Sequence, residues 1–414
     1  MTQELRRSLG VPDAVVVGLG SMVGAGVFAA MAPAAAAAGS GGLLLVGLGL
    51  AGVVAYCNAT ASARLAARYP ASGGTYVYGR ERLGPFWGYL AGWSFVVGKT
   101  ASCAAMALTV GAYVWPDQAH AVAVAAVVAL TAVNYRGVQK SARLTRAIVA
   151  VVLAVLAAVV TSCLASSAAD PARLAWDGSS GGAGGVLQAA GLLFFAFAGY
   201  ARIATLGEEV RDPARTIPRA IPLALGIAVL VYLGVAIAVL SVLGADALGR
   251  STAPLADAVR AAGAQWLVPV VRVGAAVAAL GSLLALILGV SRTTLAMARD
   301  GYLPRTLSAV HPRFQVPHHA ELAVGAVVAV VAATADVRGA IGFSSFGVLL
   351  YYALTNTSAW TLGSKWRVLA TLGLTGCLVL AFSLPLFSVV AGAAVLAAGV
   401  VAYAVRSRFG RGRL

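Results

Sequence analysis

The stretch Gly18-Leu-Gly-Ser-Met-Val-Gly-Ala-Gly-Val-Phe28 lies in the middle of the first apolar run of this 414-residue chain. The run covers residues 11–38, and about 20 helical residues are enough to cross the ~30 Å hydrocarbon core of a membrane. Four glycines stand within nine positions of the stretch. Each glycine destabilises a helix interior by ~1 kcal/mol relative to alanine. The four are Gly18, Gly20, Gly24 and Gly26. A helix that only crossed lipid would not gather glycines here.

This glycine cluster has two interpretations. Gly20 and Gly24 are four residues apart, a spacing that lets membrane helices pack closely. Alternatively, the helix is broken at bilayer depth, where irregular backbone is tolerated only beside a protein cavity. We favour the break, because it turns the positive N-terminal end of one half-helix toward an anion and the free carbonyls of the other toward a cation. The stretch therefore predicts a binding site for a zwitterion.

The composition indicates a polytopic membrane protein. Hydrophobic residues make up 60% of the chain and charged residues 11%, and the mean hydropathy is +0.88. Soluble domains carry about 25% charged residues. The formal net charge is +16, but the Lys and Arg residues lie in short loops between apolar runs. Membrane topology therefore explains this charge better than a nucleic-acid partner does, and we expect no nucleic acid to bind.

Twelve apolar runs are candidates for membrane-spanning helices, although the fourth, ninth and eleventh are short. They cover residues 11–38, 42–67, 85–114, 118–134, 144–167, 185–206, 217–244, 265–298, 319–335, 339–362, 366–383 and 385–405. A cytoplasmic N-terminus places most Lys and Arg residues in cytoplasmic loops and leaves Arg173, Arg250, Arg260 and Arg338 outside. This bias predicts a multi-pass protein of the plasma (inner) membrane with both termini in the cytoplasm.

A second interruption is expected in the sixth run. Gly199 stands among aromatic residues in Phe194-Phe-Ala-Phe-Ala-Gly-Tyr200, one five-span unit after the first break. Because the unit has an odd number of spans, the two halves would have opposite orientations in the membrane. We predict an all-α fold of twelve transmembrane helices. Residues 11–172 form the first five-helix repeat, residues 184–362 the inverted second repeat, and residues 363–414 two peripheral helices with a basic tail.

Five stretches, in this order along the chain, resemble motifs of the amino acid–polyamine–organocation (APC) transporters. They are Gly20-Ser-Met-Val-Gly-Ala-Gly-Val-Phe28, Tyr69-Pro-Ala-Ser-Gly-Gly-Thr-Tyr-Val-Tyr78, Asn134-Tyr-Arg-Gly-Val-Gln-Lys-Ser-Ala142, Phe194–Tyr200 with Gly207-Glu-Glu-Val-Arg-Asp-Pro-Ala-Arg-Thr-Ile-Pro218, and Ser291-Arg-Thr-Thr-Leu-Ala-Met-Ala-Arg-Asp-Gly-Tyr-Leu-Pro304. Each motif alone is weak, but five in order over most of residues 11–320 are specific. The resemblance implies the leucine-transporter-like five-plus-five fold and alternating-access transport of an amino acid or a related amine.

The resemblance also implies a substrate-binding site at the two interruptions. The substrate carboxylate would meet the backbone amides of Gly24, Ala25 and Gly26, and the amine would meet the carbonyls near Met22, Phe195 and Ala198. Phe195 would cover the substrate as an aromatic lid, and Phe197 and Tyr200 would be its neighbours. Backbone groups freed by unwinding would then be satisfied by the ligand itself.

Lys99 is a charged residue inside the third apolar run. It lies ~21 Å along the helix, near the bilayer centre, where a charge costs at least ~2.5–3.5 kcal/mol. It belongs either to a buried ion pair or to the lining of the central cavity, on the face of Gly92, Val96 and Cys103. Some proton-coupled relatives use a lysine in span five in place of a sodium ion, but residues 150–160 carry no charge here.

We therefore hypothesise that Lys99 takes over the titrating role, because burial disfavours the charged form of a lysine. A cation at this place would also disfavour cationic substrates. Arg202 and a charge cluster after the sixth run are candidates for an inner gate, although a solvated loop explains the cluster equally well. The gate candidates are Arg202, Glu208 and Glu209.

The expected function is secondary active, proton-coupled transport of amino acids across the plasma membrane. The alternatives are a polyamine, organic-cation or amino acid exchanger of the same fold and, more distantly, an amino acid sensor that does not translocate. An enzyme is not expected, because no nucleophile–base pair or metal-ligand cluster stands at bilayer depth. The four cysteines lie in or at the ends of apolar runs, where they serve as small apolar residues. We expect no cofactor and no metal, and as partners the substrate, protons and membrane lipid.

Overall fold

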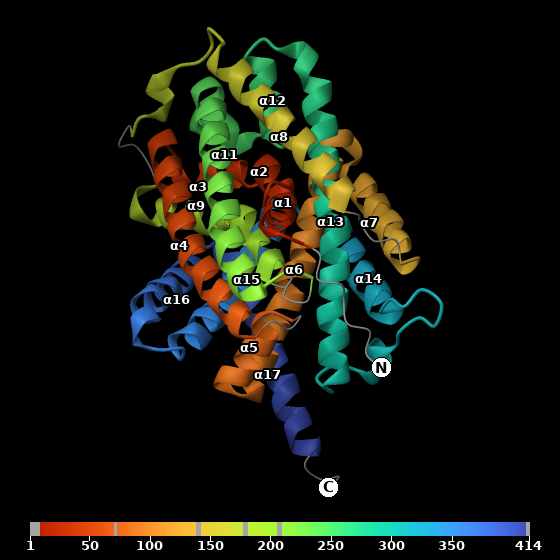
Figure 1. The fold of residues 1–414 in the computed structure, drawn as a ribbon. Helices are drawn as coiled ribbons and strands as arrows, with labels where there is room; N and C mark the ends of the chain where they lie inside the picture. Colours follow the sequence, from red (N-terminus) through yellow and green to blue (C-terminus); the bar gives the residue numbers. More distant parts are fainter. Residues whose placement is uncertain (1–8, 70–72, 138–141, 177–180, 205–208, 411–414) are drawn as a thin grey trace.

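The computed structural model describes residues 9–69, 73–137, 142–176, 181–204 and 209–410, and it has the predicted all-α architecture (Figure 1). These residues form helices and loops, with one isolated parallel bridge between Leu9 and Val210. The α-helices are α1 (Val11–Met22), α2 (Ala25–Ala29), α3 (Met31–Ala38), α4 (Gly41–Arg68), α5 (Thr75–Leu83), α6 (Pro85–Val114), α7 (Ala119–Tyr135), α8 (Ala142–Leu164), α9 (Gly182–Phe197), α10 (Ala201–Ala204), α11 (Pro213–Arg250), α12 (Pro254–Ala261), α13 (Val268–Arg299), α14 (His318–Thr334), α15 (Val337–Trp360), α16 (Arg367–Phe382) and α17 (Leu386–Gly410). Short 3-10 helices cover Pro116–Gln118, Pro171–Leu174, Ala198–Tyr200, Gln265–Leu267, Arg305–Ser308 and Ser364–Trp366.

Ten helical segments of the described residues are long and apolar enough to cross a membrane, so the chain is a multi-pass membrane protein. Among them, the short fourth run becomes a segment of 20 residues, Pro116–Tyr135, because the 3-10 helix Pro116–Gln118 precedes α7 directly. The predicted runs 319–335 and 366–383 form the shorter apolar helices α14 and α16, of 17 and 16 residues. Every predicted run thus contains a helix, and the number of twelve spans stays a prediction.

Helix α6 lies in the centre of the bundle and packs against α5, α7, α13 and α15 (Figure 1). Its crossing with α15 depends on glycine, since a Cβ atom on Gly347 would lie 2.9 Å from the Cα atom of Gly98. Helices α16 and α17 lie at the edge of the bundle (Figure 1). Large apolar side chains such as Leu230 and Phe387 point outward from the bundle, as a lipid-facing surface requires.

The first helix is interrupted where the glycines predict it. Helix α1 ends at Met22, Val23 has ψ 59° and Gly24 has φ −117° and ψ −144°, and α2 starts at Ala25. These backbone angles are not helical. Residues 23–24 therefore separate two half-helices inside the bundle.

The second interruption is milder than the sequence suggests. Helix α9 passes through a 3-10 turn at Ala198–Tyr200 into α10, and Ala198 and Ala201 keep right-handed helical angles. Gly199 is needed for a different reason: a Cβ atom there would lie 2.2 Å from the Ser21 carbonyl oxygen. Likewise, a Cβ atom on Gly26 would lie 2.6 Å from the Ala196 Cα atom. The glycines of the two interruptions thus let the two backbones touch each other.

Candidate functional site

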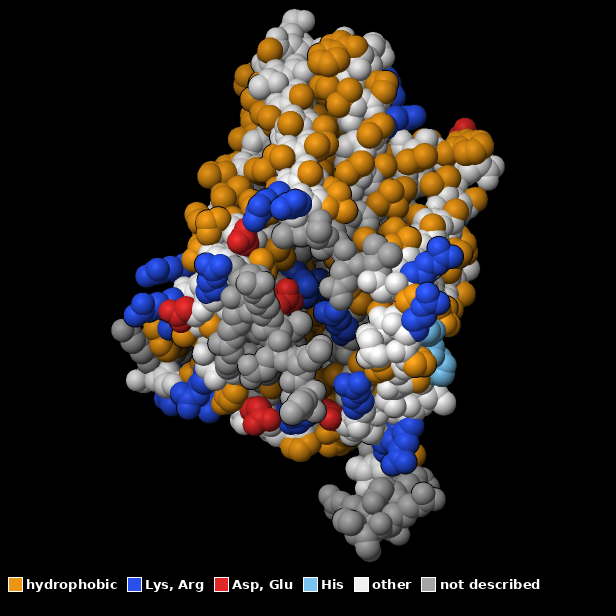
Figure 2. All heavy atoms as spheres, turned by 45° about the vertical axis from the view of Figure 1, so that its right-hand side comes forward, with side chains coloured by type: hydrophobic (Ala, Val, Ile, Leu, Met, Phe, Trp, Pro, Cys, Tyr) orange, Lys and Arg blue, Asp and Glu red, His pale blue; other side chains and the backbone are white. Residues whose placement is uncertain are grey.

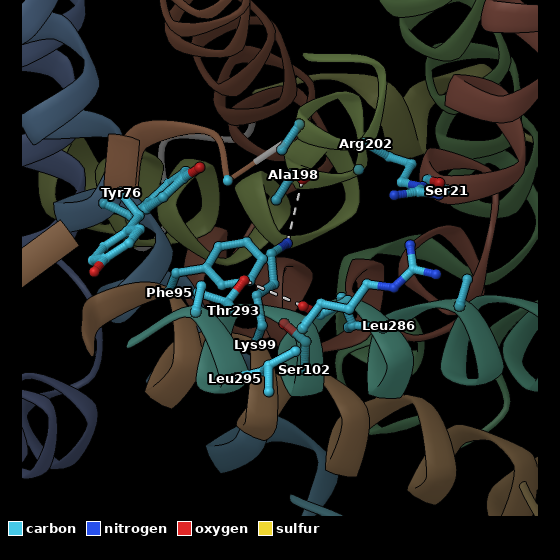
Figure 3. Close-up of a pocket in the computed structure, with 18 of the residues that line it drawn as sticks. Ser21, Tyr76, Phe95, Lys99, Ser102, Ala198, Arg202, Leu286, Thr293 and Leu295 are labelled. Atoms are coloured by element: carbon cyan, nitrogen blue, oxygen red, sulfur yellow. Dashed lines mark hydrogen bonds between the residues drawn. The ribbon is translucent and has the colours of Figure 1, made fainter. Parts of the chain in front are cut away.

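A cavity of about 610 Å³ is lined by residues from the contact of the two interrupted helices and by charged residues of α5 and α13. Figure 3 shows part of this lining. Its inner part is lined by Ser21, Lys99, Ser102, Phe195 and Ala198. Its outer part is lined mostly by charged side chains, namely Arg80, Arg202, Glu209, Arg292, Arg299 and Asp300. Figure 2 shows charged side chains around a recess on this part of the surface, below an apolar region. The volume suits a small molecule, and small-molecule sites are usually such concave pockets.

Lys99 points from α6 toward the end of α9 (Figure 3). Its Nζ atom donates a hydrogen bond of 3.3 Å to the Ala198 carbonyl oxygen, and the residue is 7% exposed. Among the described residues, no carboxylate lies within 4.0 Å of Lys99. Of the two interpretations from the sequence, the structure therefore supports the cavity lining and gives no support to the ion pair.

Tyrosine hydroxyls hold the carbonyls that the interruptions expose. Tyr232 on α11 donates to the carbonyl oxygens of Met22, at 2.6 Å, and Ala196, at 3.0 Å. Tyr352 on α15 approaches the Ala198 carbonyl oxygen at 3.4 Å. Buried carbonyls require such donors. Two of the three carbonyl groups named for the substrate amine, those of Met22 and Ala198, thus already have donors from the protein.

The predicted binding residues fall into two groups. Phe195 and Ala198 line the cavity. The others are buried close to it but do not line it, namely Met22, Gly24, Ala25, Gly26, Phe197 and Tyr200. Phe197 packs on Tyr232 and Tyr200 packs on Tyr352, each with ring centroids 5.0 Å apart. Substrate binding by these residues stays a prediction.

Ser282 on α13 separates the cavity from the Gly24 backbone. Its side chain lines the cavity, and its Oγ atom approaches the Gly20 carbonyl oxygen at 3.4 Å. A Cβ atom on Gly24 would lie 2.2 Å from that Oγ atom. A substrate carboxylate that reaches the amides of Gly24–Gly26 from the cavity must therefore pass or displace the Ser282 hydroxyl.

Polar contacts join neighbouring elements at the outer end of the cavity. Tyr76 and Arg80 on α5 both donate to the Asp300 carboxylate at the end of α13, with Arg80 Nη1 2.8 Å from Oδ2. Burial, and then the Asp300 carboxylate, raise the pKa of Tyr76 above its ordinary value, so the phenol keeps the proton that it donates. The gate candidates Arg202 and Glu209 also meet here, with Nη2 and Oε1 3.9 Å apart. Glu208 lies outside the described residues.

A model of the amino acid permease family matches residues 9–406, nearly the whole chain. The chain belongs to the amino acid permease family, within the APC superfamily. The resemblance found in the five motifs is thereby confirmed.

Several relatives of the permease are transporters. An uncharacterised transporter of Mycobacterium tuberculosis is 74% identical over 407 residues, which cover 97% of this chain and 92% of that protein. Cationic amino acid transporter 4 of Homo sapiens is 29% identical over 386 residues, covering 86% of this chain and 60% of the relative. The branched-chain amino acid permease BcaP of Bacillus subtilis is 25% identical over 388 residues, covering 88% and 82%.

Some residues in or near the permease's cavity were not predicted from the sequence. Ser282 and Ser102 are ordinary small residues within apolar runs, and no sequence signal marks them. Asp300 and Tyr76 stood inside quoted motifs, but their contact joins positions 224 residues apart. Glu321 had a signal, because it is a carboxylate within the apolar run 319–335. It is fully buried, and neither carboxylate oxygen has a hydrogen-bond partner in the described structure.

Proposed function

We propose that this permease is a secondary transporter that carries amino acids across the plasma (inner) membrane by alternating access. The observation that carries the proposal is the cavity of about 610 Å³ that ends where the two interrupted helices touch, at Lys99 and Ala198. A binding site reached from one side at the meeting point of two such helices is what alternating access between repeats requires.

The proposed architecture has twelve spans. Residues 11–172 and 184–362 form two five-helix repeats of opposite orientation, and residues 363–414 add α16 and α17 at the periphery. The position of the interruptions supports this division, because α1–α2 opens the first repeat and α9–α10 opens the second. Helices α14 and α16, with 17 and 16 residues, would complete the twelve spans beside the ten longer segments.

Both ends of the chain are proposed to lie in the cytoplasm, on the side to which the cavity opens. Leu9 pairs with the backbone of Glu209 and Arg211, next to the outer part of the cavity. The C-terminal part of α17 lies at the same end of the molecule as α5 (Figure 1). Arginines gather at this end, which favours the cytoplasmic side. The described conformation is thus inward-facing.

The proposed substrates are amino acids with neutral or anionic side chains. The cavity is lined by Arg80, Lys99, Arg202, Arg292 and Arg299, against the two carboxylates Glu209 and Asp300. Such a surplus of cations repels a cationic side chain. This argues against the polyamine or organic-cation alternative. It also separates the proposal from the cationic amino acid transporters among the relatives and brings it closer to the branched-chain permease.

Coupling to protons is part of the proposal. Lys99 bonds the Ala198 carbonyl, which the family resemblance reserves for the substrate amine, so the two ammonium groups compete for one acceptor. Loss of a proton from Lys99 would free this acceptor for the substrate. If Lys99 is the titrating group of the coupling mechanism, transport by Lys99→Gln should lose its dependence on pH. Unchanged pH dependence in that variant would remove Lys99 from the coupling mechanism.

The decisive experiment is counterflow in proteoliposomes with a panel of amino acids and amines, with and without a pH gradient. Counterflow of neutral or acidic amino acids supports the proposal, and counterflow of polyamines alone would replace it by the organic-cation alternative. Binding of amino acids without any counterflow would instead indicate a sensor.

A further inference from the structure

We propose that Glu321 is the proton-carrying residue of this permease and that Arg292 connects it to the substrate cavity. This inference rests on the proposed function, because it names the residue through which a proton gradient would drive amino acid transport. Glu321 would then carry the driving proton in place of Lys99, which keeps its own proton and only yields the Ala198 carbonyl to the substrate amine. One proton in all would move with each substrate.

Glu321 is an unusual side chain for its place. It lies in the first turn of the apolar helix α14, it is 0% exposed, and both carboxylate oxygens lack a hydrogen-bond partner in the described structure. A buried ionised carboxylate without partners is strongly unfavourable, and such groups become neutral instead. Ionisable residues inside membrane helices mark ion and proton pathways by default. In this conformation Glu321 is therefore a protonated carboxylic acid.

Helix α14 packs against α6, α7, α13 and the 3-10 helix Arg305–Ser308. None of these four described elements contains an Asp or Glu residue, so Glu321 is the sole carboxylate on its helix and on the elements packed against it. The basic groups on these elements are Lys99, His120, Arg272, Arg292, Arg299, Arg305, His318 and His319, and the weaker acids are Tyr89, Cys103, Tyr113 and Tyr135. Three of these groups, Lys99, Arg292 and Arg299, also line the substrate cavity, and the charge of Arg292 favours the ionised carboxylate of Glu321.

Arg292 belongs to α13, the helix that packs against α14, and it lines the substrate cavity. It is an exposed residue of α13, and its side chain lines the outer part of the cavity. No ion pair within 4.0 Å joins it to Glu321 in this conformation. We infer that the guanidinium can serve either of two anions, the carboxylate of a substrate in the cavity or the carboxylate of Glu321 on the neighbouring helix α14.

The coupling step follows from this choice of anion by Arg292. When Glu321 releases its proton, an anion is left in the helix interface, and Arg292 is the nearby cation that stabilises it. When the proton returns to the Glu321 carboxylate, Arg292 is free for the cavity and for an anionic group there. The step forms or breaks one O–H bond only, and the proton exchanges with water. One proton is therefore bound for each change of partner by Arg292.

His318 offers a route between Glu321 and the surface. It is three residues earlier on α14, and its Nδ1 atom is buried without a hydrogen-bond partner in the described structure. Its ring lies 5.3 Å from that of His311 and 4.2 Å from that of His319, both of which belong to the loop and helix start at this end of the molecule. An imidazole can pass a proton between its two nitrogens, so His318 serves as the entry point.

The test uses the full-length permease in proteoliposomes, with tritiated leucine, alanine and glutamate as probes. Two assays are compared: counterflow without a pH gradient, and accumulation driven by an outside pH one unit below the inside pH. One proton per substrate supports accumulation of up to about tenfold in the wild type. Glu321→Gln mimics the protonated side chain and should keep counterflow within about twofold of the wild type, but it should not accumulate substrate above equilibration.

Asp117→Asn is the matched control, because Asp117 is an exposed carboxylate in the 3-10 helix Pro116–Gln118. Counterflow and accumulation by this variant should equal those of the wild type. Accumulation by Glu321→Gln at the wild-type level would overturn the proposal. If Glu321→Gln loses both activities, Glu321→Asp decides the matter. Restored accumulation in the aspartate variant supports proton carriage, whereas inactivity of both variants assigns Glu321 a structural role and overturns it.

The outcomes also separate this inference from the proposed function. A wild-type permease that shows counterflow but no pH-driven accumulation overturns the role of Glu321 and leaves amino acid transport standing. A wild-type permease without counterflow for any probe refutes the transport proposal itself.

Discussion

Replacing Gly199 by alanine tests whether the two interrupted helices touch as described. The added Cβ atom would lie 2.2 Å from the Ser21 carbonyl oxygen, 2.4 Å from its carbon and 2.7 Å from the Met22 nitrogen. Ordinary contact starts near 3.4 Å, so the backbone of α1 would have to retreat by about 1 Å. All three are backbone atoms, which a rotamer change cannot move.

The expected magnitude follows from this overlap. Gly199 lies in a 3-10 turn with right-handed helical neighbours, so alanine fits the local backbone and the clash is the main penalty. Overpacking of this kind costs about 1–3 kcal/mol of stability. The matched control is Gly234→Ala in α11, where a Cβ atom meets nothing within 4 Å and alanine should stabilise the helix by up to ~1 kcal/mol.

The two variants should therefore change stability in opposite directions, by a total difference of about 2–4 kcal/mol. The measurement is the free energy of unfolding in mixed detergent micelles with increasing dodecyl sulfate. Counterflow should fall at least about tenfold in Gly199→Ala, because displacement of α9 moves the Ala198 carbonyl away from Lys99. Equal stability of the two variants would refute the close contact between Gly199 and Ser21.

Three further predictions concern the cavity and its walls. Lys99→Met should let arginine and lysine inhibit counterflow up to ~100-fold more strongly, since two cations about 5 Å apart at an effective permittivity near 20 repel by ~3 kcal/mol. Unchanged inhibition constants would contradict the exclusion of cationic substrates by Lys99. Tyr232→Phe leaves the Met22 and Ala196 carbonyls without their shared donor and should lower the free energy of unfolding by about 1–3 kcal/mol, whereas an unaltered unfolding curve would mean that water replaces the hydroxyl. Tyr76→Phe removes a half-buried hydrogen bond to Asp300 and should cost about 1 kcal/mol; because the pKa of Tyr76 is raised, the phenol stays protonated and the loss should be equal at pH 7 and pH 9.

Much of the fold could be predicted from the sequence, because a membrane span is a long run of apolar residues that can be read along the chain. The apolar runs became helices with bounds close to those expected, and the glycine cluster at Gly18–Gly26 became a real interruption at residues 23–24. At Gly199 the prediction was right about the place and wrong about the form. A single glycine does not reveal whether it unwinds its own helix or gives room to another, since the neighbour is far away in sequence.

The candidate site could be predicted only in part. Lys99 was found because a charge in an apolar run is costly and therefore conspicuous. Tyr232, Ser282 and Tyr352 were not found, since hydroxyl groups are common in membrane helices and their carbonyl partners lie on other helices. Glu321 carried the same signal as Lys99, a charge within an apolar run, but it was not identified from the sequence.

The sequence by itself thus determined the class of the protein, its apolar helices, the interruption in the first helix and the family, because each of these depends on residue type and spacing along the chain. The tertiary structure decided which groups share the cavity. It showed that Lys99 donates to the Ala198 carbonyl, that the Ser282 hydroxyl lies against Gly24, and that the Glu321 carboxylate is buried without a hydrogen-bond partner in the described structure. These facts depend on distances between helices, and no local pattern in a chain encodes them. The stretch Gly18–Phe28 permits the break, but the glycines of both interruptions together bring the two helices into contact.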